Sequence, residues 1–110
     1  MIGLLLAASL GAAPTLPDAV FNGVFVTTYP DGRSARLWLE RDGSYHAQGR
    51  RRDSSSGRWS VKGEQTCLRQ SRPIPVPLNF CASMAHEPGR PWTTKAVTGE
   101  TVRVELVPGR

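Results

Sequence analysis

The chain has 110 residues, of which 39% are hydrophobic and 21% charged, and its 14 lysines and arginines outnumber nine acidic residues. This length allows one domain with a modest core, and the formal net charge of +5 favours anionic partners. Two cysteines without nearby histidines or further cysteines are too few for a structural zinc site.

The N-terminal sequence has the features of a signal peptide. Residues 2–10 form an apolar run, and the small residues at 11–13 form an acceptable cleavage site. The run is shorter than the roughly 20 apolar residues that span a membrane. No Lys or Arg precedes it, and a buried N-terminal helix or strand is the alternative interpretation. We expect a signal peptide at residues 1–13 and export of residues 14–110 to the bacterial periplasm or the medium.

The rest of the chain alternates strand-like runs with turns. The runs are rich in β-branched and aromatic residues and cover residues 20–29, 34–40, 44–49, 58–62 and 101–107. Turn sequences containing glycine separate them, at residues 30–32, 41–43, 62–64 and 98–100. Only the leader resembles a helix. This spacing predicts an all-β domain over residues 14–110: a single small antiparallel meander barrel or sandwich of about six to eight strands.

The second hairpin permits a prediction of register. If residues 41–43 form a three-residue loop with Gly43 at positive φ, the apolar and polar side chains separate onto opposite faces. The inner pairs would be Leu39–Tyr45, Leu37–Ala47 and Ala35–Gly49, and the outer pairs Glu40–Ser44, Trp38–His46, Arg36–Gln48 and Ser34–Arg50. The preceding hairpin would add Phe25–Leu37 and Thr27–Ala35. In the later strands, Trp59, Val61, Val102, Val104 and Leu106 are expected to face inward.

Cys67 and Cys81 are the only cysteines, and an even count in an exported chain of this size indicates one disulfide. A metal pair or a catalytic thiol would require nearby histidines or a Cys-x-x-Cys motif, which the sequence does not contain. The segment at residues 71–80 has three prolines at alternate positions, so it suits an edge strand or an extended crossing.

Four arginines, Arg50, Arg51, Arg52 and Arg58, flank a sequence predicted to be a charged, flexible loop at residues 50–57. The loop is either a solvated hairpin tip or a contact for phosphates on an anionic envelope surface. No aromatic residue interrupts the arginines, and single-stranded nucleic acids need such stacking platforms. We therefore expect no nucleic-acid partner.

The sequence gives no indication of an enzyme. His46 is expected to pack on Trp38 across the strands, and His86 lies in a loop. Ser54–Ser56 lack a nucleophile-elbow context, and the acidic residues are scattered. We predict no catalytic residues, no metal and no cofactor.

The run Trp59-x-Val61-x-Gly63-Glu64-x-Thr66-Cys67-Leu68 resembles a stretch in small exported bacterial β-barrels of the calycin, or lipocalin-like, type. The group includes periplasmic inhibitors of secreted metalloproteases, and residues 16–25 are similar to the entry to their first strand. In those inhibitors the partner cysteine lies upstream, whereas Cys81 lies downstream. The resemblance implies that an N-terminal arm enters a protease cleft, and the matching residues here are Pro14, Thr15, Leu16, Pro17 and Asp18.

These observations favour an exported, non-enzymatic binding or envelope-interaction module that recognises an unidentified protein or envelope component. A periplasmic protease inhibitor that acts through its N-terminal arm is the alternative. We expect a monomer with no transmembrane span. A ligand binder would need a cavity lined by residues such as Phe25, Leu37 and Tyr45, unless the barrel's own side chains fill it.

Overall fold

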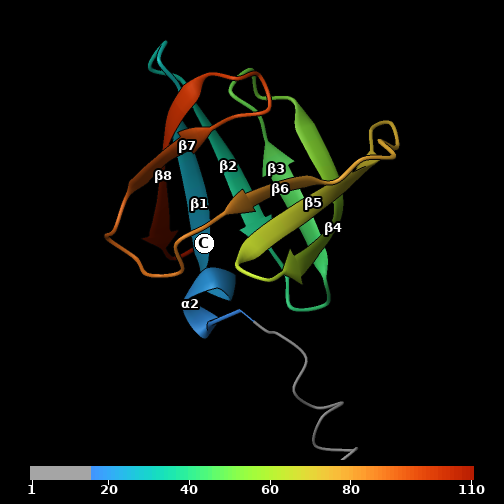
Figure 1. Cartoon of the computed structure of the whole chain (residues 1–110), viewed down its shortest axis with the longest axis horizontal. Coiled ribbons are helices and arrows are strands. Elements are labelled where there is room, and N and C mark those ends of the chain that lie inside the picture. Colours follow the sequence, from blue (N-terminus) through green and yellow to red (C-terminus); the bar gives the residue numbers. More distant parts are fainter. Residues whose placement is uncertain (1–15) are drawn as a thin grey trace, which may run out of the picture.

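The computed structural model describes residues 16–110, in which eight antiparallel strands form one sheet (Figure 1). The order across the sheet is β6-β5-β4-β3-β2-β1-β8-β7, and the sheet curls into a nearly closed barrel with β6 and β7 at its edges. The strands are β1 (Gly23–Thr28), β2 (Ser34–Leu39), β3 (Ser44–Gln48), β4 (Ser54–Lys62), β5 (Gln65–Arg72), β6 (Phe80–Ser83), β7 (Trp92–Lys95) and β8 (Thr101–Pro108). The predicted all-β antiparallel barrel is confirmed.

The predicted registers of the first two hairpins are also confirmed. Strands β2 and β3 pair Leu39 with Tyr45 and Trp38 with His46, and β1 pairs Phe25 with Leu37. Gly43 has φ +91°, and its N–H donates to the Glu40 carbonyl at 3.1 Å, which closes the three-residue loop. Alternation along each strand therefore places apolar side chains inside the barrel and polar ones outside.

The later strands follow the same alternation. Val102, Val104 and Leu106 of β8 are buried, and Trp59 and Val61 of β4 pack against the buried cluster from the opposite wall. The loop predicted at residues 50–57 is shorter than expected, because β4 already begins at Ser54. The prediction is wrong there because serines also tolerate extended backbone when a neighbouring strand pairs with them, as β3 does.

Gly57 in β4 marks an irregularity that the sequence did not reveal. The register of the β4–β5 pair shifts between Ser56 and Gly57. A Cβ at residue 57 would overlap the carbonyl oxygen of Arg69 and approach the Tyr45 ring to 2.8 Å. Glycine is therefore required for the close approach of β5 and for the position of the Tyr45 ring.

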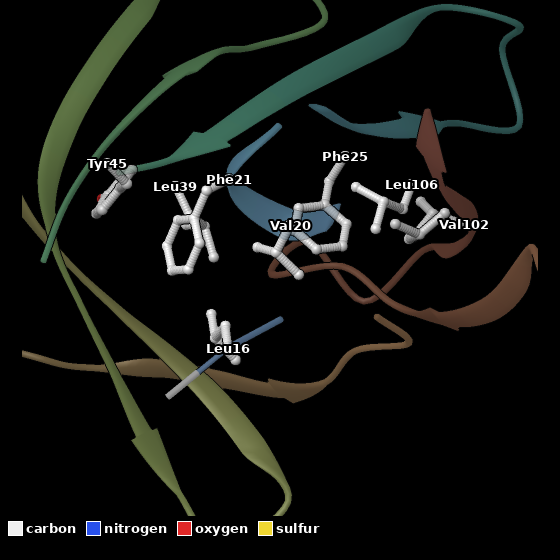
Figure 2. Close-up of a cluster of buried hydrophobic side chains, with 9 residues drawn as sticks. Leu16, Val20, Phe21, Phe25, Leu39, Tyr45, Val102 and Leu106 are labelled. Carbon is white, nitrogen blue, oxygen red and sulfur yellow. The ribbon is translucent and has the colours of Figure 1, made fainter. Parts of the chain in front are cut away.

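A short helix, α2 (Asp18–Phe21), plugs one end of the barrel, which we call the closed end (Figure 1). Figure 2 shows Val20 and Phe21 between Leu39 and Phe25 inside the barrel. The sequence prediction of a strand from residue 20 is wrong here: Val20 and Phe21 have strand propensity, but they gain more by burial in the barrel end. The signal peptide predicted at residues 1–13 lies outside the described residues. In the described part of the chain, no helix is long and apolar enough to cross a membrane.

Arg110 fastens the helix and the strands at the closed end. Its guanidinium donates to the Leu39 carbonyl at 2.6 Å and to the Glu40 carboxylate at 2.9 Å, and its Nε donates to the Gly23 carbonyl at 3.1 Å. The Trp59 indole N–H donates to the Glu40 carbonyl at 2.7 Å from the other side. The plug is thus held by apolar burial and by hydrogen bonds around its rim.

The predicted disulfide between Cys67 and Cys81 is present, and the two residues face each other in the β5–β6 pair. Cys67 is buried, with 1% of its surface exposed. Strand β6 is a four-residue edge strand whose only sheet neighbour is β5. The disulfide therefore anchors one edge of the barrel.

Replacing Gly43 with Ala should destabilise the protein by about 1 kcal/mol or more, since a Cβ is disfavoured at this positive φ. The new Cβ would also lie 2.7 Å from Arg58 Nη2. Urea unfolding monitored by tryptophan fluorescence measures the change. Gly43→Asn should cost less, because asparagine tolerates positive φ better, and equal stability of Gly43→Ala and the parent would contradict the turn assignment.

Reducing the disulfide should lower the melting temperature, because the bond restricts the unfolded chain by joining two residues that are 14 positions apart. The chain-entropy estimate for such a crosslink is about 3 kcal/mol. Calorimetry with and without dithiothreitol measures the shift, and the Cys67→Ser/Cys81→Ser variant serves as the control that should no longer respond. Two free thiols in the native protein would contradict the pairing.

Candidate functional site: a half-filled barrel

The interior of the barrel is filled only at the closed end. There, side chains from α2 and the surrounding strands form the buried cluster, which includes Leu16, Val20, Phe21, Leu39 and Leu106 (Figure 2). Beyond Phe25, toward the other end, the interior contains a cavity of about 320 Å³. We call this other end the open end, since the β1–β2, β3–β4, β5–β6 and β7–β8 connections surround it (Figure 1).

The cavity wall is mostly apolar. Side chains from all eight strands contribute to it, among them Phe25, Leu37, Ala47, Ser55, Leu68, Ala82, Trp92, Thr94 and Val104. Phe25 meets Trp92 edge to face, with the ring centroids 6.3 Å apart. Of the three residues expected to line a cavity, Phe25 and Leu37 do so. Tyr45 instead belongs to the packed closed end, where burial raises the pKa of its hydroxyl.

Trp92 is part of this apolar wall. Its indole nitrogen is buried and has no hydrogen-bond partner within residues 16–110. An unsatisfied buried donor costs on the order of 1–3 kcal/mol, and buried tryptophan N–H groups usually find an acceptor. The nitrogen itself is covered by surrounding atoms, so Trp92 contributes apolar ring surface to the cavity wall.

Arg50 ties three of the connections at the open end together. Its guanidinium donates two hydrogen bonds to Glu100, at 2.7 and 3.2 Å, and lies 3.5 Å from Asp31. It also stacks on the Tyr29 ring, at 4.1 Å from the centroid. The hydrogen bonds from Arg50 hold the pKa of Glu100 below its usual value. Arg50 is therefore a structural residue of the rim.

The four arginines predicted to form one anionic contact are divided by the structure. Arg58 lies at the closed end, where it pairs with Ser44 across the strands and donates to the Asp42 carbonyl at 3.0 Å. Arg51 and Arg52 are exposed at the open end, and within the described residues their side chains form no hydrogen bond or ion pair. Arg33 and Arg36 line the same polar depression on the outside of β2 and β3, next to the predicted outer pair Arg36–Gln48.

The described part of the predicted inhibitor arm lies against the barrel. Leu16 is buried, with 5% of its surface exposed, Pro17 precedes α2, and Asp18 accepts a hydrogen bond from Arg41 at 3.0 Å. Pro14 and Thr15 lie outside the described residues. Leu16, Pro17 and Asp18 thus belong to the plug of the closed end.

The two histidines lie apart. His46 stacks on Trp38 on the outer face, with ring centroids 4.7 Å apart, as its cross-strand pairing predicted. His86 lies in the connection between β6 and β7. Among residues 16–110, no group of three or more His, Cys, Asp or Glu side chains is arranged to hold a metal ion.

No protein-family model matches the chain, and no curated protein or solved structure matches it either. The resemblance to calycin barrels and to the protease inhibitors therefore stays a prediction based on the residues that carry it.

Replacing Arg50 with Ser should lower the melting temperature by a few degrees, whereas Arg51→Ser should leave it nearly unchanged, since only Arg50 has ion-pair partners. The Arg50–Glu100 pair stabilises the fold above the pKa of an unfolded glutamate, about 4. Its contribution is lost as pH falls through the lowered pKa of folded Glu100. Thermal unfolding at pH 7 and at pH 3 tests both statements, and equal effects of the two substitutions at pH 7 would contradict them.

Proposed function

We propose that the protein is an exported, non-enzymatic binding module that holds an apolar molecule, or the apolar part of a larger one, inside the barrel. The observation that carries the proposal is the cavity of about 320 Å³ between Phe25 and the open end. Binding sites for small molecules are typically concave, largely apolar and already formed, with a few polar groups that orient the ligand. The wall around this cavity is likewise mostly apolar.

The construction of the barrel supports this function. Because α2 closes the opposite end with buried side chains, a ligand enters and leaves through the open end. The Arg50 contacts stabilise the wall around the entrance, and the disulfide holds edge strand β6 to the wall farther from it. The same disulfide is compatible with an oxidising compartment, which supports export.

The protease-inhibitor alternative receives less support. An arm that enters a cleft must be free to leave its own domain, whereas Leu16 is buried in the plug and Asp18 is bonded to Arg41. Withdrawing Leu16 would expose apolar surface at the closed end. The cavity function requires no such rearrangement.

A matched pair of substitutions on β7 tests the proposal. Thr94 lines the cavity, whereas Thr93 is exposed on the outer face of the same strand. Thr94→Phe should fill part of the cavity and weaken binding of the neutral fluorophore N-phenyl-1-naphthylamine at least about tenfold. Thr93→Phe introduces the same side chain outside and should leave the affinity unchanged. Fluorescence titration measures both.

Equal affinity of the parent and Thr94→Phe, or no binding by the parent, would contradict the proposal.

A further inference from the structure

The exposed large apolar side chains of the described residues are concentrated at the open end. Ile74 and Leu78, in the β5–β6 connection, are 69% and 74% exposed, and Val97, in the β7–β8 connection, is 77% exposed. Val76 and Phe80 add partly exposed apolar surface to the first of these connections. Apolar side chains that are exposed together, as in the β5–β6 connection, are typical of interaction sites.

The β5–β6 connection has a defined shape. The Val76 N–H donates to the Gln70 carbonyl at 3.0 Å, and the Gln70 side chain donates to the Ile74 carbonyl at the same distance. The connection therefore bends back onto β5. Figure 1 shows it projecting from the barrel wall beyond the neighbouring strands.

Basic side chains lie between these apolar tips. Since the sheet order is β6-β5-β4-β3-β2-β1-β8-β7, the β3–β4 and β1–β2 connections separate the β5–β6 connection from the β7–β8 connection. The β3–β4 connection carries Arg51 and Arg52, and the β1–β2 connection carries Arg33. Arg72 is the last residue of β5, just before the β5–β6 connection. Within residues 16–110, no carboxylate forms an ion pair with any of the four, and two of the nearby carboxylates, Asp31 and Glu100, pair with Arg50.

We propose that the open end is a docking surface for an anionic phospholipid membrane. The aliphatic tips would enter the boundary between headgroups and acyl chains, and the arginines would bind the phosphates. A nucleic acid is the less suitable partner, because bases stack on aromatic side chains and gain little from isoleucine, leucine or valine. Aliphatic tips next to unpaired arginines fit a partner with anionic groups on its surface and apolar chains below them, as in a phospholipid membrane.

This docking places the entrance of the cavity against the membrane. An apolar molecule could then pass between the lipid layer and the barrel without crossing water. Val97 and Phe80 belong to both surfaces, but Ile74, Leu78 and the four arginines do not line the cavity, so substitutions there test docking separately. Thr94→Phe, which fills the cavity, should leave membrane binding unchanged.

Sedimentation with vesicles tests the proposal. The protein should bind vesicles of phosphatidylglycerol and phosphatidylcholine in equal parts, and should bind pure phosphatidylcholine at least about tenfold more weakly at 0.1 M salt. Raising the salt to 0.5 M should weaken binding to the anionic vesicles, because salt screens the arginines.

Two double substitutions separate the contributions. Ile74→Ser/Leu78→Ser should weaken vesicle binding about fivefold or more with the net charge unchanged, and Arg51→Ser/Arg52→Ser should weaken it about tenfold or more. Lys62→Ser/Arg90→Ser removes the same charge from exposed positions outside these four connections and should have a much smaller effect. Circular dichroism confirms that each variant is folded.

Heparin distinguishes a membrane from a simple polyanion. Its binding should depend on Arg51 and Arg52 and be insensitive to the change at Ile74 and Leu78. The proposal is overturned if the parent does not bind anionic vesicles, if the control double variant weakens binding as much as the arginine variant, or if Ile74→Ser/Leu78→Ser binds vesicles as the parent does. Binding of the fluorophore without binding to vesicles would overturn only the docking surface and leave the cavity function standing.

Discussion

The insertion of Val20 and Phe21 into one end of the barrel is the interaction on which the remaining structure depends. An eight-stranded wall encloses more interior than its inward side chains fill, so a small barrel needs an additional element or leaves space. Here α2 fills the closed end, and burial of each large apolar side chain contributes on the order of 1.5–3 kcal/mol. The helix is too short to reach past Phe25, and the open half of the interior stays a cavity.

The division into a packed half and a hollow half organises the other stabilising contacts. Arg110 and the Trp59 indole bind carbonyl groups around the plug, so their hydrogen bonds hold the closed end. At the open end, where no apolar core spans the barrel, Arg50 links the connections through Glu100 and Asp31. The disulfide secures the short edge strand β6 between these two regions. Stability thus comes from the closed end and the wall, which leaves the open end available for recognition.

Much of the fold could be predicted from the sequence, because local patterns determine it. Strict alternation and the glycine of the Arg41–Gly43 turn were sufficient to assign the register of β1, β2 and β3. Helix α2 was missed, since Val20 and Phe21 continue a run of strand-forming residues and only tertiary burial makes them helical. The bulge at Gly57 was also missed, because the approach of the Arg69 carbonyl depends on a partner strand and not on neighbouring residues.

The candidate site was harder to predict than the fold. Whether inward side chains fill a barrel depends on their summed volume and on the plug, and neither follows from periodicity. The run of three arginines is visible in the sequence, but their different roles are not. Arg50 is structural because it donates hydrogen bonds to Glu100, fifty residues away in the chain. Arg33 and Arg36 join the same surface through strand pairing, which follows from the predicted outer pairs Arg36–Gln48 and Ser34–Arg50.

The proposed function requires a barrel that is packed at one end and able to take a ligand at the other. Methyl NMR spectra recorded during titration with N-phenyl-1-naphthylamine test it most directly. We expect large chemical-shift changes at Leu37, Leu68 and Val104, which line the cavity, and small changes at Val20 and Leu39 at the closed end. Saturation of the protein with probe while the Leu37 and Leu68 signals stay in place would contradict it.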